Sequence, residues 1–307
     1  MNKKIVIGIP KALLYYEYEI LWKEYFRLLN IKTIESIDTN KELIMKGINC
    51  SVDESCLPYK IYIGHVNYLI NRCDYIFVPR IVDYGRDKKM CIKYNGLYDN
   101  VKTLFPKEKI ITINIDKKNN KYEFIEYIKL GLKFNKNIVK IIYAYIRAKN
   151  KQNKYNIKET KDQNKKLNQN KIKILIVSHP YVIHDEYIGK PIKKILLNMN
   201  IEILYTDKYN KKINNKIIKK ISPTLYWKNS KETINSIYYY KNKVDGIIFL
   251  SAFPCGLDSL VNELLIRKLK DIPITNILLD ENNITTGIET RLESFIDILK
   301  ERKRTNE

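Results

Sequence analysis

The chain has 307 residues, of which 45% are hydrophobic and 29% charged. This length predicts two domains, and the composition excludes a disordered chain, a collagen-like fibre and a disulfide-dense miniprotein. The net charge is +22, but the lysines are spread along the whole chain, so we expect no nucleic-acid partner. No apolar run reaches the roughly 20 residues of a membrane span, and we find no signal peptide. We therefore expect no membrane association and a cytoplasmic location.

The first half of the sequence alternates apolar runs with amphipathic segments. Short apolar runs bounded by Gly, Pro or polar residues predict buried strands, and a 3.6-residue apolar period predicts helices. Thr39 is the expected N-cap of the helix that follows it. The run at 74–80 ends at a proline, where we expect the strand to stop. The predicted strands are 3–10, 31–36, 74–80 and 109–115, and the predicted helices are 12–29, 41–47, 58–71 and one or two within 123–148.

The same alternation restarts after residues 149–170, which are rich in Lys, Asn and Gln and are expected to be a polar linker. The fold class predicted is α/β, with two doubly wound parallel-sheet domains of the Rossmann or flavodoxin-like type, 1–148 and 171–307, facing a cleft. Ligands of such sheets bind beyond the carboxyl ends of the strands. The predicted strands of the second half are 171–180, 201–206, 244–252 and 273–280, and its clearest helices are 258–269 and 289–300.

Five cysteines in a chain without an export signal indicate reduced thiols or metal ligands rather than disulfides. Cys56, Cys91 and Cys255 lie in loops after strands or before helices, whereas Cys50 and Cys73 are expected to be small buried hydrophobic residues. A helix N-terminus favours a thiolate. Three such thiolates could hold zinc with a fourth ligand, or a four-iron cluster. The sequence contains no CxxC pair, so spacing does not decide between the two.

Polar side chains near these cysteines are further candidates. His179, in a Ser-His-Pro-Tyr turn after a predicted strand, and Ser259, four residues after Cys255, are the expected neighbours of the site. His65 on a mixed helix face is expected to be a structural hydrogen-bonding residue, and Asp258 can serve as a helix N-cap. The sequence has no P-loop, GxGxxG or HExxH motif, so it lacks the usual supports for nucleotide hydrolysis, dinucleotide binding and zinc-peptidase chemistry.

Seven sequence blocks carry a resemblance to a known family. In chain order they are IGIPKALLYYEYEILWKEYF, SVDESCLPYKIYIGHV, DYIFVPRIV, CIKYNGLYD, SHPYVIHDEY, VDGIIFLSAFPCGLDSLVNELL and DENNITTGIETRLESFID. Together, and in this order, they resemble the uncharacterised domain of the acyl-CoA dehydratase activase-related proteins, a family similar to the subunits of the 2-hydroxyacyl-CoA dehydratases. The resemblance implies that Cys56, Cys91 and Cys255 hold a [4Fe-4S] cluster. Asn282 stands where the family usually carries a histidine.

The resemblance also implies a function in anaerobic metabolism. The ATP-hydrolysing, actin-like activase that often accompanies this domain is absent from the sequence, so we expect a separate activase as partner. The leading hypothesis is low-potential electron transfer to the cluster, with dehydration or reduction of an acyl-CoA thioester and assembly as a homo- or heterodimer. Two alternatives stay open at this point: a non-catalytic electron carrier or assembly partner, and a module that binds zinc or a small ligand.

Overall fold

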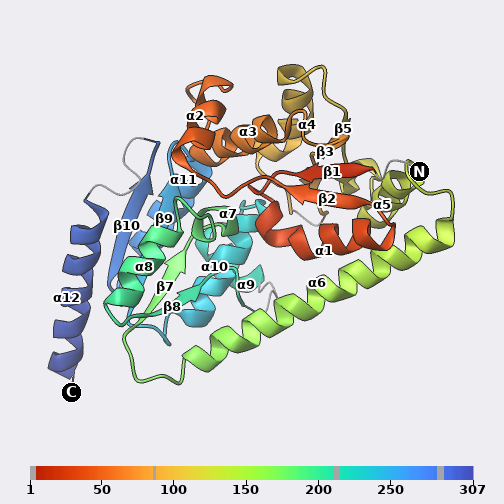
Figure 1. Cartoon of the computed structure of the whole chain (residues 1–307). Helices are drawn as coiled ribbons and strands as arrows, with labels where there is room; N and C mark the ends of the chain where they lie inside the picture. Colours follow the sequence, from red (N-terminus) through yellow and green to blue (C-terminus); the bar gives the residue numbers. More distant parts are fainter. Residues whose placement is uncertain (1–4, 86–87, 210–214, 282–286, 307) are drawn as a thin grey trace. The chain divides into compact units, whose positions relative to one another are not determined.

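The structure is a computed structural model that describes residues 5–85, 88–209, 215–281 and 287–306. The chain divides into two compact units: Met1–Asn156 with Tyr226–Lys228, and Ile157–Leu225 with Asn229–Glu307. Each unit contains a four-stranded parallel sheet with helices between the strands (Figure 1). This arrangement confirms the predicted α/β class of the Rossmann or flavodoxin-like type. Among the helices described, none is long and apolar enough to cross a membrane.

The first unit is built on a sheet with the strand order β2-β1-β3-β5. Its central strand β1 pairs in parallel with β2 and with β3, and its Ile7 and Ile9 side chains are fully buried. Its strands are β1 (Val6–Ile9), β2 (Lys32–Glu35), β3 (Tyr75–Phe77), β4 (Arg80–Asp83), β5 (Ile110–Ile111) and β6 (Asn114–Asp116). Its helices are α1 (Tyr15–Leu28), α2 (Lys41–Asn49), α3 (Leu57–Leu69), α4 (Ile92–Leu104), the short 3-10 helix η1 (Lys117–Asn119) and α5 (Glu123–Leu132).

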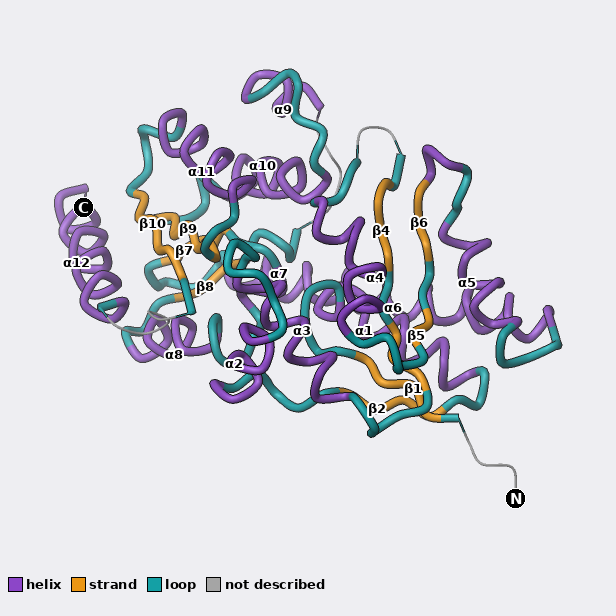
Figure 2. Tube along the Cα trace, turned by 90° about the horizontal axis from the view of Figure 1, so that it is seen from above, coloured by secondary structure: helices purple, strands orange, loops and turns teal. Residues whose placement is uncertain are grey.

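Strand pairing in the first unit continues beyond Pro79, where the sequence predicted that it would stop. Proline has no backbone N–H to give to the ladder. The residues on either side of Pro79 still donate backbone hydrogen bonds to the neighbouring strand segment. The Val78 N–H donates to Ile111 O and the Arg80 N–H to Ile113 O, each at 2.9 Å. The pairing of β3 with β5 is thereby followed by a second parallel pair, β4 with β6, which run side by side in Figure 2.

Two glycines let α2 and α3 approach each other at backbone contact. A Cβ atom on Gly47 would lie 1.9 Å from the carbonyl oxygen of Lys60, and one on Gly64 would lie 2.2 Å from that of Leu43. Real Cβ atoms do not come this close to backbone oxygens. The two helices can therefore pack this closely only because both positions are glycine. This packing fixes the position of α3.

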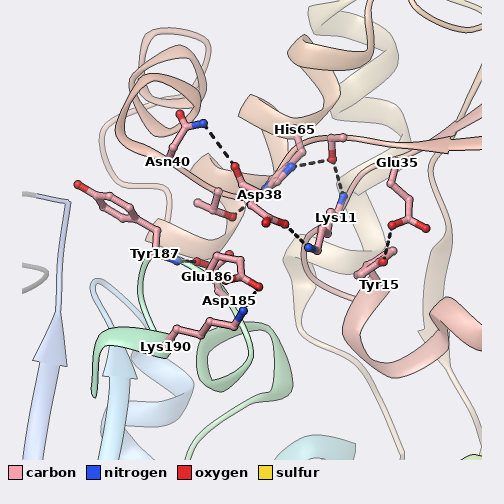
Figure 3. Close-up of polar contacts among 12 residues, drawn as sticks. Lys11, Tyr15, Glu35, Asp38, Asn40, His65, Asp185, Glu186, Tyr187 and Lys190 are labelled. Carbon is pink, nitrogen blue, oxygen red and sulfur yellow. Dashed lines mark hydrogen bonds and ion pairs between the residues drawn. The ribbon is translucent and has the colours of Figure 1, made fainter. Parts of the chain in front are cut away.

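A buried histidine joins three segments of the first unit. His65 on α3 is fully buried, with Nδ1 2.7 Å from Ser36 Oγ and Nε2 3.0 Å from Thr39 Oγ1 (Figure 3). Ser36 Oγ also accepts the Lys11 N–H at 2.8 Å, so its own proton is suited to donation to Nδ1. Burial and the nearby Lys11 cation lower the pKa of His65 to about 3, although Asp38 acts in the opposite direction. The histidine is thus a neutral structural residue, the role expected for it.

The same contacts correct the predicted N-cap of α2. The cap is Asn40, whose side-chain oxygen accepts the Leu43 N–H at 2.9 Å. Thr39 precedes it and is buried against His65 instead. Both residue types are good N-caps, and the buried imidazole decides which one takes that position.

Residues 149–170, expected to be a polar linker, are for the most part helical. The helix α6 (Ile138–Lys166) runs through them. Lys, Gln and Glu are good helix formers, and two buried glutamines anchor this polar helix. Gln152 Oε1 accepts the Leu21 N–H at 3.1 Å in the first unit. In the second unit, Gln163 Nε2 donates to Tyr205 O at 2.8 Å.

The second unit repeats the sheet topology of the first. Its strand order, β10-β9-β7-β8, places the first and third strands of the unit at the centre, as in the first unit. Leu175, Phe249 and Leu265 are among the fully buried residues of its core. The strands are β7 (Lys173–Val177), β8 (Glu202–Tyr205), β9 (Gly246–Ala252) and β10 (Ile274–Leu279). The helices are α7 (Pro180–Ile183), α8 (Lys190–Asn198), α9 (Asn215–Ile221), α10 (Lys228–Tyr240), α11 (Gly256–Lys268) and α12 (Ile288–Asn306).

Candidate functional site

The strand order of each sheet reverses between its two central strands, β1 and β3 in the first unit and β7 and β9 in the second. Open α/β sheets bind ligands at the carboxyl ends of such strands. In the second unit, His179 follows β7 and Cys255 follows β9. These two residues therefore lie at the position where a ligand is expected.

Three of the five cysteines immediately precede a helix. Cys56 is the N-cap of α3, Cys91 of α4 and Cys255 of α11, and all three are partly buried. The amide N–H groups of a first helical turn and the helix dipole favour negative charge at such positions. Cys50, by contrast, is the C-cap of α2, and Cys73 lies between α3 and β3.

In the first unit, Lys93 connects the starts of α3 and α4. Its Nζ atom donates to Ser55 Oγ at 3.3 Å and lies 4.9 Å from the centre of the Tyr59 ring. Burial raises the pKa of Tyr59, a hydrogen bond from Asn100 opposes this, and Cys56 adds to the rise. Cys56 follows Ser55, and Cys91 is two residues before Lys93. The structure thus brings Cys56 and Cys91 to the same end of two neighbouring helices, with a cation beside them.

A cavity of about 290 Å³ opens next to Cys91, because the residues on either side of this cysteine line its wall. It lies at the ends of β4 and β6, whose buried aspartates Asp83 and Asp116 are register partners. The backbone of Lys89 pairs with Tyr226 and Lys228, which brings Trp227 to the cavity. The lining residues are Val82, Asp83, Lys89, Met90, Ile92, Asn95, Asp116, Lys118, Asn119 and Trp227.

In the second unit, a hydrogen bond joins the residues that follow the two central strands. His179 Nε2 lies 2.8 Å from Asp258 Oδ1, and the His179 ring stacks on Tyr181 with centroids 5.0 Å apart. Burial raises the pKa of Asp258, but His179 and a hydrogen bond with Cys255 lower it more, so the net pKa lies below its usual value. Cys255, Asp258 and His179 therefore form one connected group.

The remaining candidates take structural positions. Ser259 Oγ donates to the backbone oxygen of Cys255 at 2.9 Å, so its hydroxyl bonds the helix backbone. Cys73 packs against Gly8 and donates to Leu69 O at 3.5 Å. Burial raises the pKa of Cys73 to about 11, which opposes thiolate formation. Asn282 lies outside the described residues.

Within either unit, the described residues include no group of three His, Cys, Asp or Glu side chains arranged to hold a metal ion. Cys56 and Cys91 belong to the first unit and Cys255 to the second. The candidate ligands are thus divided between the two units.

The family model of the CoA enzyme activase uncharacterised domain matches residues 6–209, two thirds of the chain. The chain belongs to this family. The match covers Cys56, Cys91 and His179, and it ends before Cys255 and Asp258. The resemblance read from the sequence is thereby confirmed at the level of a CoA-enzyme activase-related domain.

Other comparisons add little to the description of this CoA enzyme activase family member. No curated protein matches it. Two solved structures of the substrate-binding protein FpvC from Pseudomonas aeruginosa, with Mn²⁺ and with Ni²⁺, are 11% and 13% identical to it. The alignments cover 96% of this chain and 99% and 98% of those chains, with TM-scores of 0.28 and 0.29. TM-scores this low do not establish a shared fold.

Three side chains of this CoA enzyme activase-related chain make contacts that were not expected from its sequence. Lys93 follows a candidate cysteine by two residues, and only the packing of α4 on α3 brings it to Ser55. Asp258 was expected as an N-cap, but Cys255 holds that position and Asp258 binds His179. Trp227 reaches the cavity from a segment more than 130 residues beyond Cys91 in the chain. No local pattern in the sequence predicts these contacts.

Proposed function

We propose that this chain binds a [4Fe-4S] cluster through Cys56, Cys91 and Cys255 and acts in an acyl-CoA dehydratase type of redox system. The observation that carries the proposal is the position of these cysteines, because each precedes the first turn of a helix and the other two do not. The family adds support, since it is a domain family of CoA enzyme activases.

The donor set suits an iron–sulfur cluster. Thiolates are its usual ligands, and helix N-termini stabilise their negative charge. Lys93 adds a cation next to Ser55, which directly precedes Cys56. Zinc in a closed structural site would need a fourth protein ligand. His179 could offer only its Nδ1 atom, because Nε2 is hydrogen-bonded to Asp258. When bound, a cluster with three cysteine ligands would supply one-electron transfer and one iron open to a further ligand.

The chain's own residues would serve the substrate in two places. The Asp258 carboxylate holds His179 by its Nε2 atom and so can stabilise the protonated ring at the carboxyl end of β7. The cavity beside Cys91 combines Trp227 and Met90 with two lysine, two asparagine and two aspartate side chains, a mixture suited to a ligand with apolar and polar parts. An acyl-CoA thioester has both.

The electron would come from a separate ATP-dependent, actin-like activase, because the chain has no nucleotide-binding motif of its own. We place this chemistry in the cytoplasm of an anaerobic cell, where thiols stay reduced. The second candidate is an electron carrier that passes the electron to a partner enzyme and binds no thioester. The position of the three cysteines supports both candidates equally.

Metal analysis of the anaerobically purified protein tests the cluster. We expect a brown protein with about four iron and about four sulfide ions per chain. Serine replacements of Cys56, Cys91 or Cys255 should each remove most of the iron, whereas Cys50→Ser and Cys73→Ser should retain it. A colourless protein with stoichiometric zinc would contradict the proposal, and loss of iron from Cys73→Ser would show that the ligands are wrongly assigned.

Electron paramagnetic resonance separates the enzyme from the carrier. For an enzyme, we expect a signal that appears only with the activase, a reductant and Mg-ATP, and that changes when an acyl-CoA ester is added. Reduction by dithionite alone, with no response to any ester in a panel of 2-hydroxyacyl- and enoyl-CoA compounds, would favour the carrier.

A further inference from the structure

The helix α6 exposes a second apolar seam opposite the face that it buries. Ile141, Ala144, Tyr145, Ala148 and Gln152 form the buried face. On the opposite face, positions 139, 143, 146, 150, 153 and 157 follow one another at alternating steps of four and three residues. Such 4-3 spacing is the pattern of a coiled-coil seam. The residues of this seam are Val139, Tyr143, Ile146, Asn150, Asn153 and Ile157.

The apolar members of the seam are well exposed. Val139 is 72% exposed, Tyr143 53% and Ile146 47%, all on helix turns that follow one another. Ile157 is 56% exposed further along the same helix. A row of exposed apolar side chains on one helix face, over about three heptads, is typical of a surface that binds another helix.

A basic row flanks the seam on one side. Lys140, Arg147, Lys154 and Lys161 are spaced by seven residues, so they occupy the same flanking position in successive heptads. Across the part of the chain that the structure describes, none of the four forms an ion pair. The flanking positions of a coiled coil choose its partner by charge.

We propose that this face of α6 binds a partner helix that carries its own 4-3 apolar seam and acidic residues in the flanking positions. The apolar seam supplies the contact, the basic row selects an acidic partner, and the two asparagines set the register. The proposal is independent of the cluster and of its ligands.

A second copy of this chain does not fit the charges. In an antiparallel pair of α6 helices, the basic row would face itself. In a parallel pair it would face positions 142, 149, 156 and 163, which are Ile, Lys, Asn and Gln and include no acid. Like charges at these positions oppose pairing, so self-association is disfavoured.

A lipid surface and a nucleic acid fit less well than a helix. Asn150 and Asn153 interrupt the apolar face and would be costly to bury in lipid, whereas an asparagine in a coiled-coil seam can pair with a polar partner residue. A phosphate backbone would use the basic row but leave Val139, Tyr143 and Ile146 without a role.

A designed peptide tests the surface directly. The probe is a labelled helical peptide of about four heptads, with Leu and Ile in the seam, two asparagines and Glu in both flanking rows. A matched peptide carries Lys in place of every Glu. Using fluorescence anisotropy with the full-length protein, we expect the Glu peptide to bind more tightly than the Lys peptide, and its affinity to fall as salt rises.

Two variants and one control complete the test. Ile146→Asp should abolish binding of the Glu peptide. The triple variant Lys140→Glu, Arg147→Glu, Lys154→Glu should weaken it about tenfold or more and should gain affinity for the Lys peptide. The control with the same change in net charge is Lys193→Glu, Lys194→Glu, Lys219→Glu, on α8 and α9. Circular dichroism checks that all variants keep their helix content.

Four results would overturn the proposal. The first is that the Glu peptide does not bind, and the second is that both triple variants weaken it equally. The third is tighter binding of duplex DNA or phosphatidylserine vesicles that is lost in Ile146→Asp. The fourth is a dimer of the wild-type chain, seen by sedimentation, that Ile146→Asp converts to a monomer.

Discussion

The ammonium group of Lys93 lies 3.3 Å from the Ser55 hydroxyl, which places a cation from the first turn of α4 beside the start of α3. The residues that precede these two helices are Cys91 and Cys56. Two helix N-termini and a lysine side chain all favour negative charge at this place. The local electrostatics therefore suit an anionic group held by the two thiols.

Replacement of Lys93 by Gln should make the proposed cluster harder to reduce. Loss of a positive charge next to a centre that gains an electron destabilises the reduced state, so the reduction potential should become more negative. A redox titration followed by electron paramagnetic resonance measures this shift. Lys193→Gln, on the exposed side of α8, is the matched control and should leave the potential unchanged. A potential that rises in Lys93→Gln would show that this cation does not act on the cluster.

Folding should slow the alkylation of Cys73 more than that of any other cysteine in the chain. Its pKa of about 11 leaves about one thiolate in a thousand at pH 8. Pulse alkylation of cluster-free protein with iodoacetamide, followed by mass mapping, should show slow modification of Cys73 that accelerates as the pH rises towards 10. A peptide containing Cys73 serves as the unfolded reference. Equal rates in the protein and the peptide would contradict the burial of this thiol.

The sequence predicted the α/β class because buried parallel strands are nearly continuous apolar runs, as β7 and β9 illustrate. It could not predict the second half of α6, because the Lys- and Asn-rich residues 149–166 have the composition of a solvated linker. What makes that segment a helix is the burial of Gln152 and Gln163, whose partners are more than 40 residues away along the chain. Asn40 replaces Thr39 as N-cap for a similar reason, since His65 binds Thr39.

The candidate site, like the fold, could be predicted from the sequence only in part. Positions before helices could be predicted from the local sequence, where Pro58 and Gly256 follow Cys56 and Cys255. The contacts between segments could not, because they depend on packing. Lys93 meets Ser55 across 38 residues, and His179 meets Asp258 across 79. Charge and hydrophobicity patterns carry no information about such pairs until the strand order is known.

His65 should make the protein less stable as the pH falls below 6.5. Its pKa is about 3 in the folded state and 6.5 ordinarily, so the unfolded chain binds the extra proton between these values. The contribution of His65 to the free energy of unfolding is fully present above pH 6.5 and is lost progressively towards pH 3. From pH 7 to pH 5 the loss should be about 2 kcal/mol of the free energy of unfolding.

Urea unfolding at pH 5, 6 and 7 measures this dependence. His65→Gln keeps a polar side chain for Ser36 and Thr39 but does not titrate, so it should be less stable than the wild type at pH 7 and show a weaker dependence on pH. The other titratable groups are common to both proteins, and the difference between the two curves therefore reports His65 alone. If the free energies of unfolding of the two proteins fell equally with pH, His65 would not be a buried neutral histidine.

Gly47→Ala should destabilise the protein even though alanine is the better helix former. In the middle of a helix this change ordinarily gains about 0.5–1 kcal/mol. Here the new Cβ would lie 1.9 Å from the Lys60 carbonyl oxygen, so α2 and α3 would have to move apart. Displacement of a packed helix pair costs about 1–3 kcal/mol or more, which exceeds the gain.

Gly96→Ala on α4 is the matched control, because the nearest atom to its Cβ would be Asn100 Nδ2 at 3.6 Å. At position 96 the higher helix propensity of alanine should therefore not be offset by a clash. Gly96→Ala should be as stable as the wild type or slightly more so. Equilibrium unfolding in urea compares the three proteins at pH 7. Because Cys56 is the N-cap of α3, Gly47→Ala should also lower the iron content of the reconstituted protein more than Gly96→Ala does. If Gly47→Ala were as stable as Gly96→Ala, the close approach of α2 and α3 would be wrong, and with it the position assigned to Cys56.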